Sequence, residues 1–449
     1  MEAVAAKLGV SLGYCYRERA QIYLRIARYL SNYVDRPRIS YLPEVDDFQV
    51  RVHRVLHYAT FGDVDIAFRE CDSLVADALP GYQKIEALRA NAFTSMRFGA
   101  VDRAEHASAA ATDVWQREKA AQTPVQRDAG AACLALLGAQ FAYYRGNVND
   151  ALALARRAVT SFEALETTSP HLKELYAESR GELGSSLCNA GEWERGHDEL
   201  ADAETQLGRA RCASSQLAAR VTLEVWMLRT YLPLGSRSWY PARERMEGLT
   251  KAFELSYSSG SLIEATVALR VLAEFHAMAG NERELLDTTR QTMLLAKNQP
   301  SERIRVQTAL NLAVLLLMTR HWRSASALVP HASQLDSCDA YHRQLAEYFA
   351  AAWALKSGRL REAWKLANSD AGRAGSSALL ARRRIVGASA AHELGKKRDA
   401  QALAEMAVTE AERFGLAPLL KEAYQVAAKA IGGAQYKRRA REVADVICA

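Results

Sequence analysis

The chain repeats one arrangement of hydrophobic and polar positions along most of its length. A segment with apolar residues at helical spacing ends at a glycine, four mostly polar residues follow, and a small residue begins a second helical segment. The clearest copies pair Gly62 with Ala67, Gly99 with Ala104, Gly146 with Ala151, Gly191 with Gly196, Gly358 with Ala363 and Gly395 with Ala400. Weaker copies occur at Gly235, at Gly280 and at Arg320, where the glycine is missing.

Each copy predicts an αα-hairpin. Glycine adopts the left-handed conformation that ends a helix without the steric cost of a Cβ atom, and the small residue lets the second helix pack closely against the first. Successive turns lie 37 to 47 residues apart, so each unit has room for two helices of roughly 15 to 20 residues. Because one hairpin cannot bury its own apolar side, we expect about nine or ten of them to stack into a solenoid.

The repeat resembles the tetratricopeptide repeat family over roughly residues 48–435. The best copy has residues where the family has a Leu-Gly pair, an aromatic residue and two small residues: Leu183, Gly184, Trp193, Gly196 and Ala203. The units are longer than the family's standard repeat, as in long-helix bacterial signalling members. The resemblance implies an all-α protein in which residues 48–449 form a right-handed α-solenoid of tetratricopeptide-like hairpins.

In that family, the first helix of each hairpin lines a concave groove that holds an extended peptide or a partner helix. Aligning the turns with the family places ten side chains toward this groove: Gln140, Tyr144, Ser185, Asn189, Arg229, Arg270, Glu274, Gln307, Asn311 and Tyr348. Asn311 is the most suggestive, because an amide in an apolar run must find partners or cost on the order of 1 to 3 kcal/mol. It resembles the family's peptide-backbone clamp; the other interpretation is an asparagine bonded to the neighbouring hairpin.

Residues 1–32 do not fit the repeat and resemble a partial helix-turn-helix. A short helix would turn at Gly9, and Ser11 would cap a second helix. In such modules the second helix enters the major groove of DNA, which implies contacts from Ser11, Leu12, Gly13, Tyr14, Arg17 and Arg19. The other interpretation is a capping helix of the solenoid. Residues 33–47 are polar and contain prolines, so we expect a linker there.

Composition agrees with a folded helical protein. Of 449 residues, 49% are hydrophobic and 24% charged, with 10 prolines and 25 glycines, which excludes a disordered or collagen-like chain. The longest apolar run, Leu312–Met318, is far too short to cross a membrane, and the first residues make a poor secretory signal. We expect a cytoplasmic protein without membrane contact. Its excess of arginine and alanine, which GC-rich codons produce, suggests a bacterial source.

No motif for catalysis or metal binding stands out. His53 and His57 share a helix face, but no third ligand is evident, so packing or exposure is the preferred interpretation. The string from Gly9 to Gly13 reads G-x-S-x-G but lacks the preceding strand of a nucleophile elbow, and no phosphate-binding glycine loop occurs. The 7 cysteines form no C-x-x-C. We therefore expect no enzyme, no metal and no cofactor.

The C-terminal end of the chain is basic. By count, residues 371–449 carry 14 basic and 8 acidic side chains, most of the excess coming from three runs: Arg382–Arg384, Lys396–Arg398 and Lys437–Arg441. Such a patch would suit nucleic acid or an acidic partner. A solvated end of the solenoid is the favoured interpretation.

These features predict a regulatory or interaction protein that binds a peptide, a protein or a small ligand in its groove. Joined to the helix-turn-helix fragment, the solenoid would be the sensor or oligomerisation part of a bacterial transcription regulator, which allows a homo-oligomer. A ligand that changes the solenoid's pitch would reposition the DNA-binding unit. The alternative is a scaffold or adaptor without DNA contact.

Overall fold

The computed structural model describes residues 47–448 except 166–168, 210–214, 232–239, 300, 318, 320, 330–334, 336–337 and 370–376. The described part of the chain consists of helices and connecting turns, without a β-strand. The helix-turn-helix fragment and the linker up to residue 46 lie outside it. The same holds for the predicted DNA contacts Ser11, Tyr14, Arg17 and Arg19.

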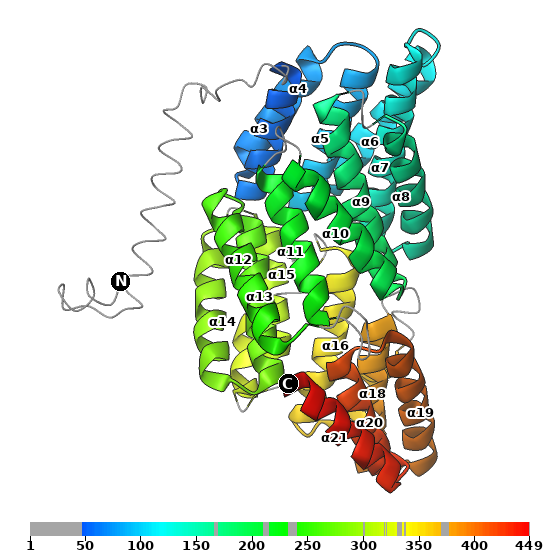
Figure 1. Cartoon of the computed structure of the whole chain (residues 1–449). Coiled ribbons are helices and arrows are strands. Elements are labelled where there is room, and N and C mark those ends of the chain that lie inside the picture. Colours follow the sequence, from blue (N-terminus) through cyan, green and yellow to red (C-terminus); the bar gives the residue numbers. More distant parts are fainter. Residues whose placement is uncertain are drawn as a thin grey trace, which may run out of the picture.

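Within the described residues the helices form ten consecutive hairpins, shown from blue to red in Figure 1. The first five pairs are α3 (Asp47–Phe61) with α4 (Val64–Asp77), α5 (Tyr82–Phe98) with α6 (Val101–Glu118), α7 (Pro124–Arg145) with α8 (Val148–Glu163), α9 (Pro170–Asn189) with α10 (Trp193–Arg209), and α11 (Ser215–Tyr231) with α12 (Ala242–Ser258). The last five are α13 (Leu262–Ala279) with α14 (Glu282–Lys297), α15 (Glu302–Leu317) with η1 (Trp322–Leu328), α16 (Ala340–Lys356) with α17 (Leu360–Ala367), α18 (Ser377–Glu393) with α19 (Lys397–Phe414), and α20 (Ala417–Ala430) with α21 (Ala434–Cys448). This is the predicted all-α, right-handed solenoid of tetratricopeptide-like hairpins.

The predicted turns are confirmed residue by residue. All six glycines of the clear copies have left-handed backbone conformations, with φ between 73° and 94°: Gly62, Gly99, Gly146, Gly191, Gly358 and Gly395. The alanines five positions later are at most 1% exposed: Ala67, Ala104, Ala151, Ala363 and Ala400. The glycine therefore ends the first helix, and the small residue brings the second helix against it.

The weak copy at Arg320 departs from the pattern. The segment after it, Trp322–Leu328, is a 3₁₀-helix in place of a second α-helix. The turn has no glycine to end the first helix. Val329 is extended, with ψ of 123°, as expected for a residue before a proline. The seventh hairpin is therefore incomplete on its outer side.

The hairpins form two layers. The first helices contact the first helices of the next hairpin, as in α5 with α7 and α7 with α9, whereas the second helices pack on their own partner and on the following first helix. Buried small apolar side chains fill the space between the layers, for example Ala139, Ala155, Leu183 and Leu187 between α7, α8 and α9. The first helices thus line the inner side of the solenoid.

The inner layer also touches itself across the curve. Helix α3 contacts α11 and α13, and α5 contacts α15; Figure 1 shows α3, in blue, beside the green helices. Helix α13 also contacts α21, the second helix of the last hairpin. Each of these pairs is at least four hairpins apart, so inner side chains of distant repeats meet in the interior. None of the described helices has the length and apolar character needed to cross a lipid bilayer.

Candidate functional site: the inner face of the solenoid

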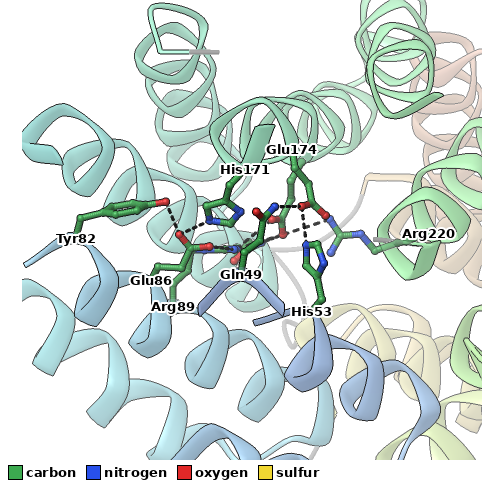
Figure 2. A network of polar contacts seen from close by, with 10 residues as sticks. Gln49, His53, Tyr82, Glu86, Arg89, His171, Glu174 and Arg220 are labelled. Atoms are coloured by element: carbon green, nitrogen blue, oxygen red, sulfur yellow. Dashed lines mark hydrogen bonds and ion pairs between the residues drawn. The ribbon is translucent and has the colours of Figure 1, made fainter. Parts of the chain in front are cut away.

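Polar side chains from the first five hairpins meet in the interior. We call them the closed network: Gln49, His53, Tyr82, Glu86, Arg89, Gln140, His171, Glu174, Glu178 and Arg220. Figure 2 shows side chains from α3, α5, α9 and α11 converging on the carboxylates at its centre. Most of these side chains are less than 10% exposed, so they are interior groups that need partners.

Arg89 lies at the centre of the closed network and is 1% exposed. Its Nη1 lies 3.2 Å from Oε2 of Glu178, and its Nη2 lies 3.6 Å from Oε1 of Glu86. Oε1 of Glu178 also accepts a hydrogen bond from Nε2 of Gln140 at 3.3 Å and lies 3.5 Å from Nη2 of Arg220. Two carboxylates therefore compensate the buried guanidinium, which is the condition for keeping a charge in the interior.

Two histidines extend the closed network. Nε2 of His53 lies 2.7 Å from Oε2 of Glu174, and Nε2 of His171 lies 2.7 Å from Oε2 of Glu86. Burial lowers the pKa of His171, but the Glu86 carboxylate outweighs burial and raises it overall. Burial likewise raises the pKa of Glu86, yet His171, Arg89 and the Tyr82 hydroxyl bring it down to about 2. When His171 is protonated, the contact is an ion pair in which each charge favours the other.

Further contacts close the curve between the first two hairpins and the fifth and sixth. Arg97 on α5 forms an ion pair with Glu264 on α13. Nε2 of Gln216 lies 2.9 Å from Nδ1 of His57. His53 and His57, which share a helix face, thus both hold distant helices together. Among the described residues no group of three or more His, Cys, Asp or Glu side chains could hold a metal ion.

Four of the ten predicted groove residues lie on α7 and α9. Gln140 is 5% exposed and belongs to the closed network. Oγ of Ser185 donates to Oε2 of Glu224 at 3.1 Å, and Nδ2 of the exposed Asn189 donates to the carbonyl oxygen of Ser185 at 3.1 Å. The ring of Tyr144 faces the guanidinium of Arg303 on α15, 4.7 Å from the ring centroid.

Four more lie on α13 and α15. Arg270 and Glu274 form an ion pair at 3.4 Å, and the Tyr231 hydroxyl donates to Glu274. Gln307 and Asn311 both turn toward the start of α16. Nε2 of Gln307 donates to Oδ2 of Asp339 at 2.9 Å, and Nδ2 of Asn311 donates to the Gln307 carbonyl oxygen at 2.8 Å and lies 3.1 Å from Nε2 of His342.

The last two lie apart from the others. Tyr348 on α16 is 8% exposed, with the guanidinium of Arg382 6.0 Å from its ring centroid. Nε of Arg229 donates to Nε2 of His197 at 3.1 Å, and its guanidinium lies over the rings of Trp226 and Tyr240. Because His197 is on α10, Arg229 is engaged with the outer layer.

Sequence reasoning missed several side chains that remain accessible on the inner face. We call them the open inner face: Tyr143, Glu182, Tyr341, Arg382 and Glu422. The charges around Tyr143 include Glu182, Glu224 and Asp339, and those around Tyr341 include Glu274 and Arg382. Side chains of non-adjacent hairpins therefore face one another here. The sequence of α9 contains an indication of this polar surface, because the polar residues 178, 182, 185 and 189 follow helical spacing and therefore share one face of the helix.

Glu182 is the most perturbed carboxyl of the open inner face. Burial raises its pKa, Arg220 lowers it, and the nearby Glu224 and Glu178 raise it again, to about 7. Its carboxyl group has no hydrogen bond or ion pair in the described part of the chain. Glu182 therefore keeps its proton to a higher pH than an ordinary surface glutamate does.

The C-terminal basic runs separate into different roles. Arg383 and Arg384 are held by Glu347 and Glu410 respectively, at 2.9 and 2.5 Å. Lys396 lies over the ring of Trp364, 3.3 Å from its centroid. Within the run Arg382–Arg384, expected on the surface, Arg383 is therefore buried and Arg384 is held in an ion pair, while Arg382 is partly exposed.

One pocket of about 410 Å³ opens between α7 and α8. Its lining combines the apolar Phe141 and Leu154 with Arg145 and Asp150. None of the predicted groove residues and none of the open inner face lines it.

No protein family model and no curated protein sequence matches the chain. Solved structures resemble its fold. NprR in complex with its cognate peptide NprX matches with a TM-score of 0.53 at 14% identity, over 90% of this chain and 100% of that one. The Rap protein complexed with Competence and Sporulation Factor matches with a TM-score of 0.51 at 10% identity, over 90% and 99%. The apo quorum sensor NprR from B. thuringiensis matches with a TM-score of 0.50 at 14% identity, over 81% and 99%. At such identities the likeness concerns the fold, a solenoid of tetratricopeptide-like hairpins.

Proposed function

We propose that the chain is a regulatory protein that binds an extended peptide, or an extended segment of a protein, on its inner face. The observation that carries the proposal is the contrast between the two parts of that face. Each carboxylate and each arginine of the closed network has an ion-pair partner within it, whereas Glu182, Tyr341 and Arg382 have no hydrogen bond or ion pair within the described residues. Accessible polar groups with free bonding capacity are what a polar ligand requires.

The fold likeness supports the same proposal. Of the similar structures, NprR was solved with its cognate peptide and Rap with Competence and Sporulation Factor, and both span nearly the whole solenoid of this chain. Asn311 suits contact with a peptide backbone. Its Nδ2 bonds to the carbonyl oxygen of Gln307, which leaves its amide oxygen to accept from a ligand N–H.

The proposal is tested with the full chain and peptides of random sequence. Immobilised protein is incubated with a synthetic heptapeptide library, retained peptides are identified by mass spectrometry, and their affinities are measured by calorimetry. We expect Asn311→Ala and Arg270→Ala each to weaken binding about tenfold or more, as loss of a buried polar contact does. Asn368→Ala is the matched control, because Asn368 makes the same type of bond to a carbonyl oxygen, that of Trp364, but is exposed on the outer layer. Retention of no peptide at all would refute the proposal.

We further propose that the protein regulates transcription. This proposal depends on the resemblance of residues 1–32 to a helix-turn-helix. Fluorescence anisotropy with duplex DNA at 50 and 200 mM salt tests it, since phosphate contacts weaken steeply over about that range. Salt-sensitive binding that responds to a groove peptide would support a regulator. Absence of binding at the lower salt would favour a scaffold or adaptor without DNA contact.

A further inference from the structure

Two adjacent arginines on α18 use their donors in opposite ways. Arg383 is 3% exposed; its Nη1 bonds to Oε2 of Glu347 at 2.9 Å, and its Nη2 bonds to the carbonyl oxygens of Leu366 and Ser369 at 3.0 and 2.9 Å. Arg382 is partly exposed on the inner face and makes no hydrogen bond or ion pair in the described part of the chain. Arg383 joins α18 to the preceding hairpin of α16 and α17, and Arg382 keeps its donors free.

The surroundings of Arg382 come from three other helices. Glu422 on α20, Tyr348 on α16, Glu274 on α13 and Tyr341 on α16 interact electrostatically with it, and the ring centroid of Tyr348 lies 6.0 Å from its guanidinium. Burial lowers the pKa of Arg382, but Glu422 and Glu274 more than offset this, so the guanidinium stays charged. Neither carboxylate forms an ion pair with it, and Glu274 is already engaged with Tyr231 and Arg270.

The geometry selects the kind of group that Arg382 can receive. A guanidinium offers five N–H donors in a planar fork, which matches the two oxygens of a carboxylate. The hydroxyls of Tyr341 and Tyr348 are further donors beside it, and neither makes a hydrogen bond within the described residues. The anionic group that an ordinary peptide offers to such a fork is a carboxylate, at its C-terminus or on an aspartate or glutamate side chain.

We propose that Arg382, assisted by the hydroxyls of Tyr341 and Tyr348, binds a carboxylate group of the peptide ligand. This inference rests on the proposed function and specifies its ligand. The carboxylate belongs either to the free C-terminus of the peptide or to an aspartate or glutamate side chain. Both sources present the same planar pair of oxygens.

Three synthetic heptapeptide libraries separate the possibilities. The first has a free C-terminus and no acidic residues, the second has an amidated C-terminus and includes Asp and Glu, and the third is amidated and contains no carboxylate. Each is incubated with the immobilised full chain, and retained peptides are measured by calorimetry. Retention from the first library assigns Arg382 to the C-terminus, and retention from the second assigns it to a side chain.

Variants then connect the selection to Arg382. We expect Arg382→Gln to weaken binding of the retained peptides by about 10 to 100-fold, and Arg382→Lys, which keeps the charge but loses the fork, by a smaller factor. Lys397→Gln removes the same charge from an exposed position outside the inner face and should leave affinity unchanged. The far-ultraviolet circular dichroism and melting temperature of each variant verify that it folds.

Each result has a definite meaning. Preference for carboxylate-bearing peptides that disappears in Arg382→Gln supports the inference. Equal retention from all three libraries, with equal affinity for Arg382→Gln, overturns it while leaving peptide binding intact. Retention from none of the libraries overturns the proposed function and this inference together.

Discussion

Gly184 and Gly196 face each other across the hairpin of α9 and α10 so closely that a Cβ atom on either would lie 2.8 Å from the carbonyl oxygen of the other. Real Cβ atoms do not approach backbone this closely, so one helix would have to move. In the best tetratricopeptide-like copy, Gly184 belongs to the Leu-Gly pair and Gly196 is one of the two small residues. Glycine is needed at both positions because the two helices cross too closely for a side chain, and not because of an unusual backbone conformation.

The close approach predicts a cost for any side chain at this crossing. We expect Gly196→Ala to destabilise the protein by about 1 to 3 kcal/mol, as overpacking of a close-packed interior does. Gly208→Ala is the control in the same helix, because a Cβ there meets nothing within 4 Å, and better helix propensity should stabilise it by up to about 1 kcal/mol. Urea unfolding followed by circular dichroism measures both. Equal midpoints would contradict the packing argument.

Removal of the central arginine should weaken the closed network far more than removal of a surface arginine. Arg89→Met leaves Glu86 and Glu178 without their shared partner, and we expect a loss of about 3 to 5 kcal/mol. In the control, Arg117→Met, the broken ion pair with Asp113 has both side chains 65% exposed, so the loss should be below about 1 kcal/mol. Differential scanning calorimetry makes the comparison, and similar shifts would refute the role assigned to Arg89.

The His171–Glu86 ion pair predicts a pH window of stability. The lowered pKa of Glu86 gives a contribution that is complete above its ordinary value of 4.5 and is lost as pH falls toward about 2. The raised pKa of His171 gives a contribution that is complete below 6.5 and is lost as pH rises beyond it. Between pH 4.5 and pH 6.5, the melting temperature of His171→Gln should lie furthest below that of the parent. At higher pH the two melting temperatures should approach each other. His106→Gln, at an exposed histidine, should show no such window.

The raised pKa of Glu182 predicts that the protein loses stability as the pH rises, which is the opposite of the effect of the Glu86 carboxyl group. Its pKa of about 7 lies above the ordinary 4.5, so the folded state holds the proton more tightly and loses stability as pH rises through this range. Glu182→Gln should therefore melt at a higher temperature than the parent at pH 8, with the difference vanishing near pH 4.5. Glu362→Gln, at a 48% exposed position paired with Arg359, should not gain stability at pH 8. A gain for Glu182→Gln that is independent of pH would argue against the perturbed carboxyl.

The hairpins were predictable because their determinants are local. Gly146 needs a left-handed conformation and Ala151 a close contact, and both requirements lie within six residues of sequence. The pairing of Arg97 with Glu264, 167 residues away, was not predictable. It depends on the pitch of the solenoid, which accumulates small rotations over four hairpins. The residue pattern of a single repeat does not determine the total rotation over four repeats.

The candidate site was predictable only in part for a related reason. Turn alignment identified the inner helices and placed Asn311 and Glu274 on them, although most of the predicted side chains already have internal partners. Arg382 was missed because it stands in a run of three arginines. Successive residues of a helix point about 100° apart, so Arg382 reaches the open inner face while Arg383 is buried against the preceding hairpin, and composition alone favours a surface patch.

The contact between α3 and α13 has a mechanical consequence. In a solenoid whose repeats touch only their neighbours, a pulling force detaches hairpins singly from the ends. Here Phe61 of the first hairpin is packed with Leu262 and Leu269 of the sixth, and Arg97 of the second covers the 3% exposed Glu264. Stretching the chain from its ends should therefore rupture this half of the molecule in one large extension step, while the remaining hairpins give way in smaller ones.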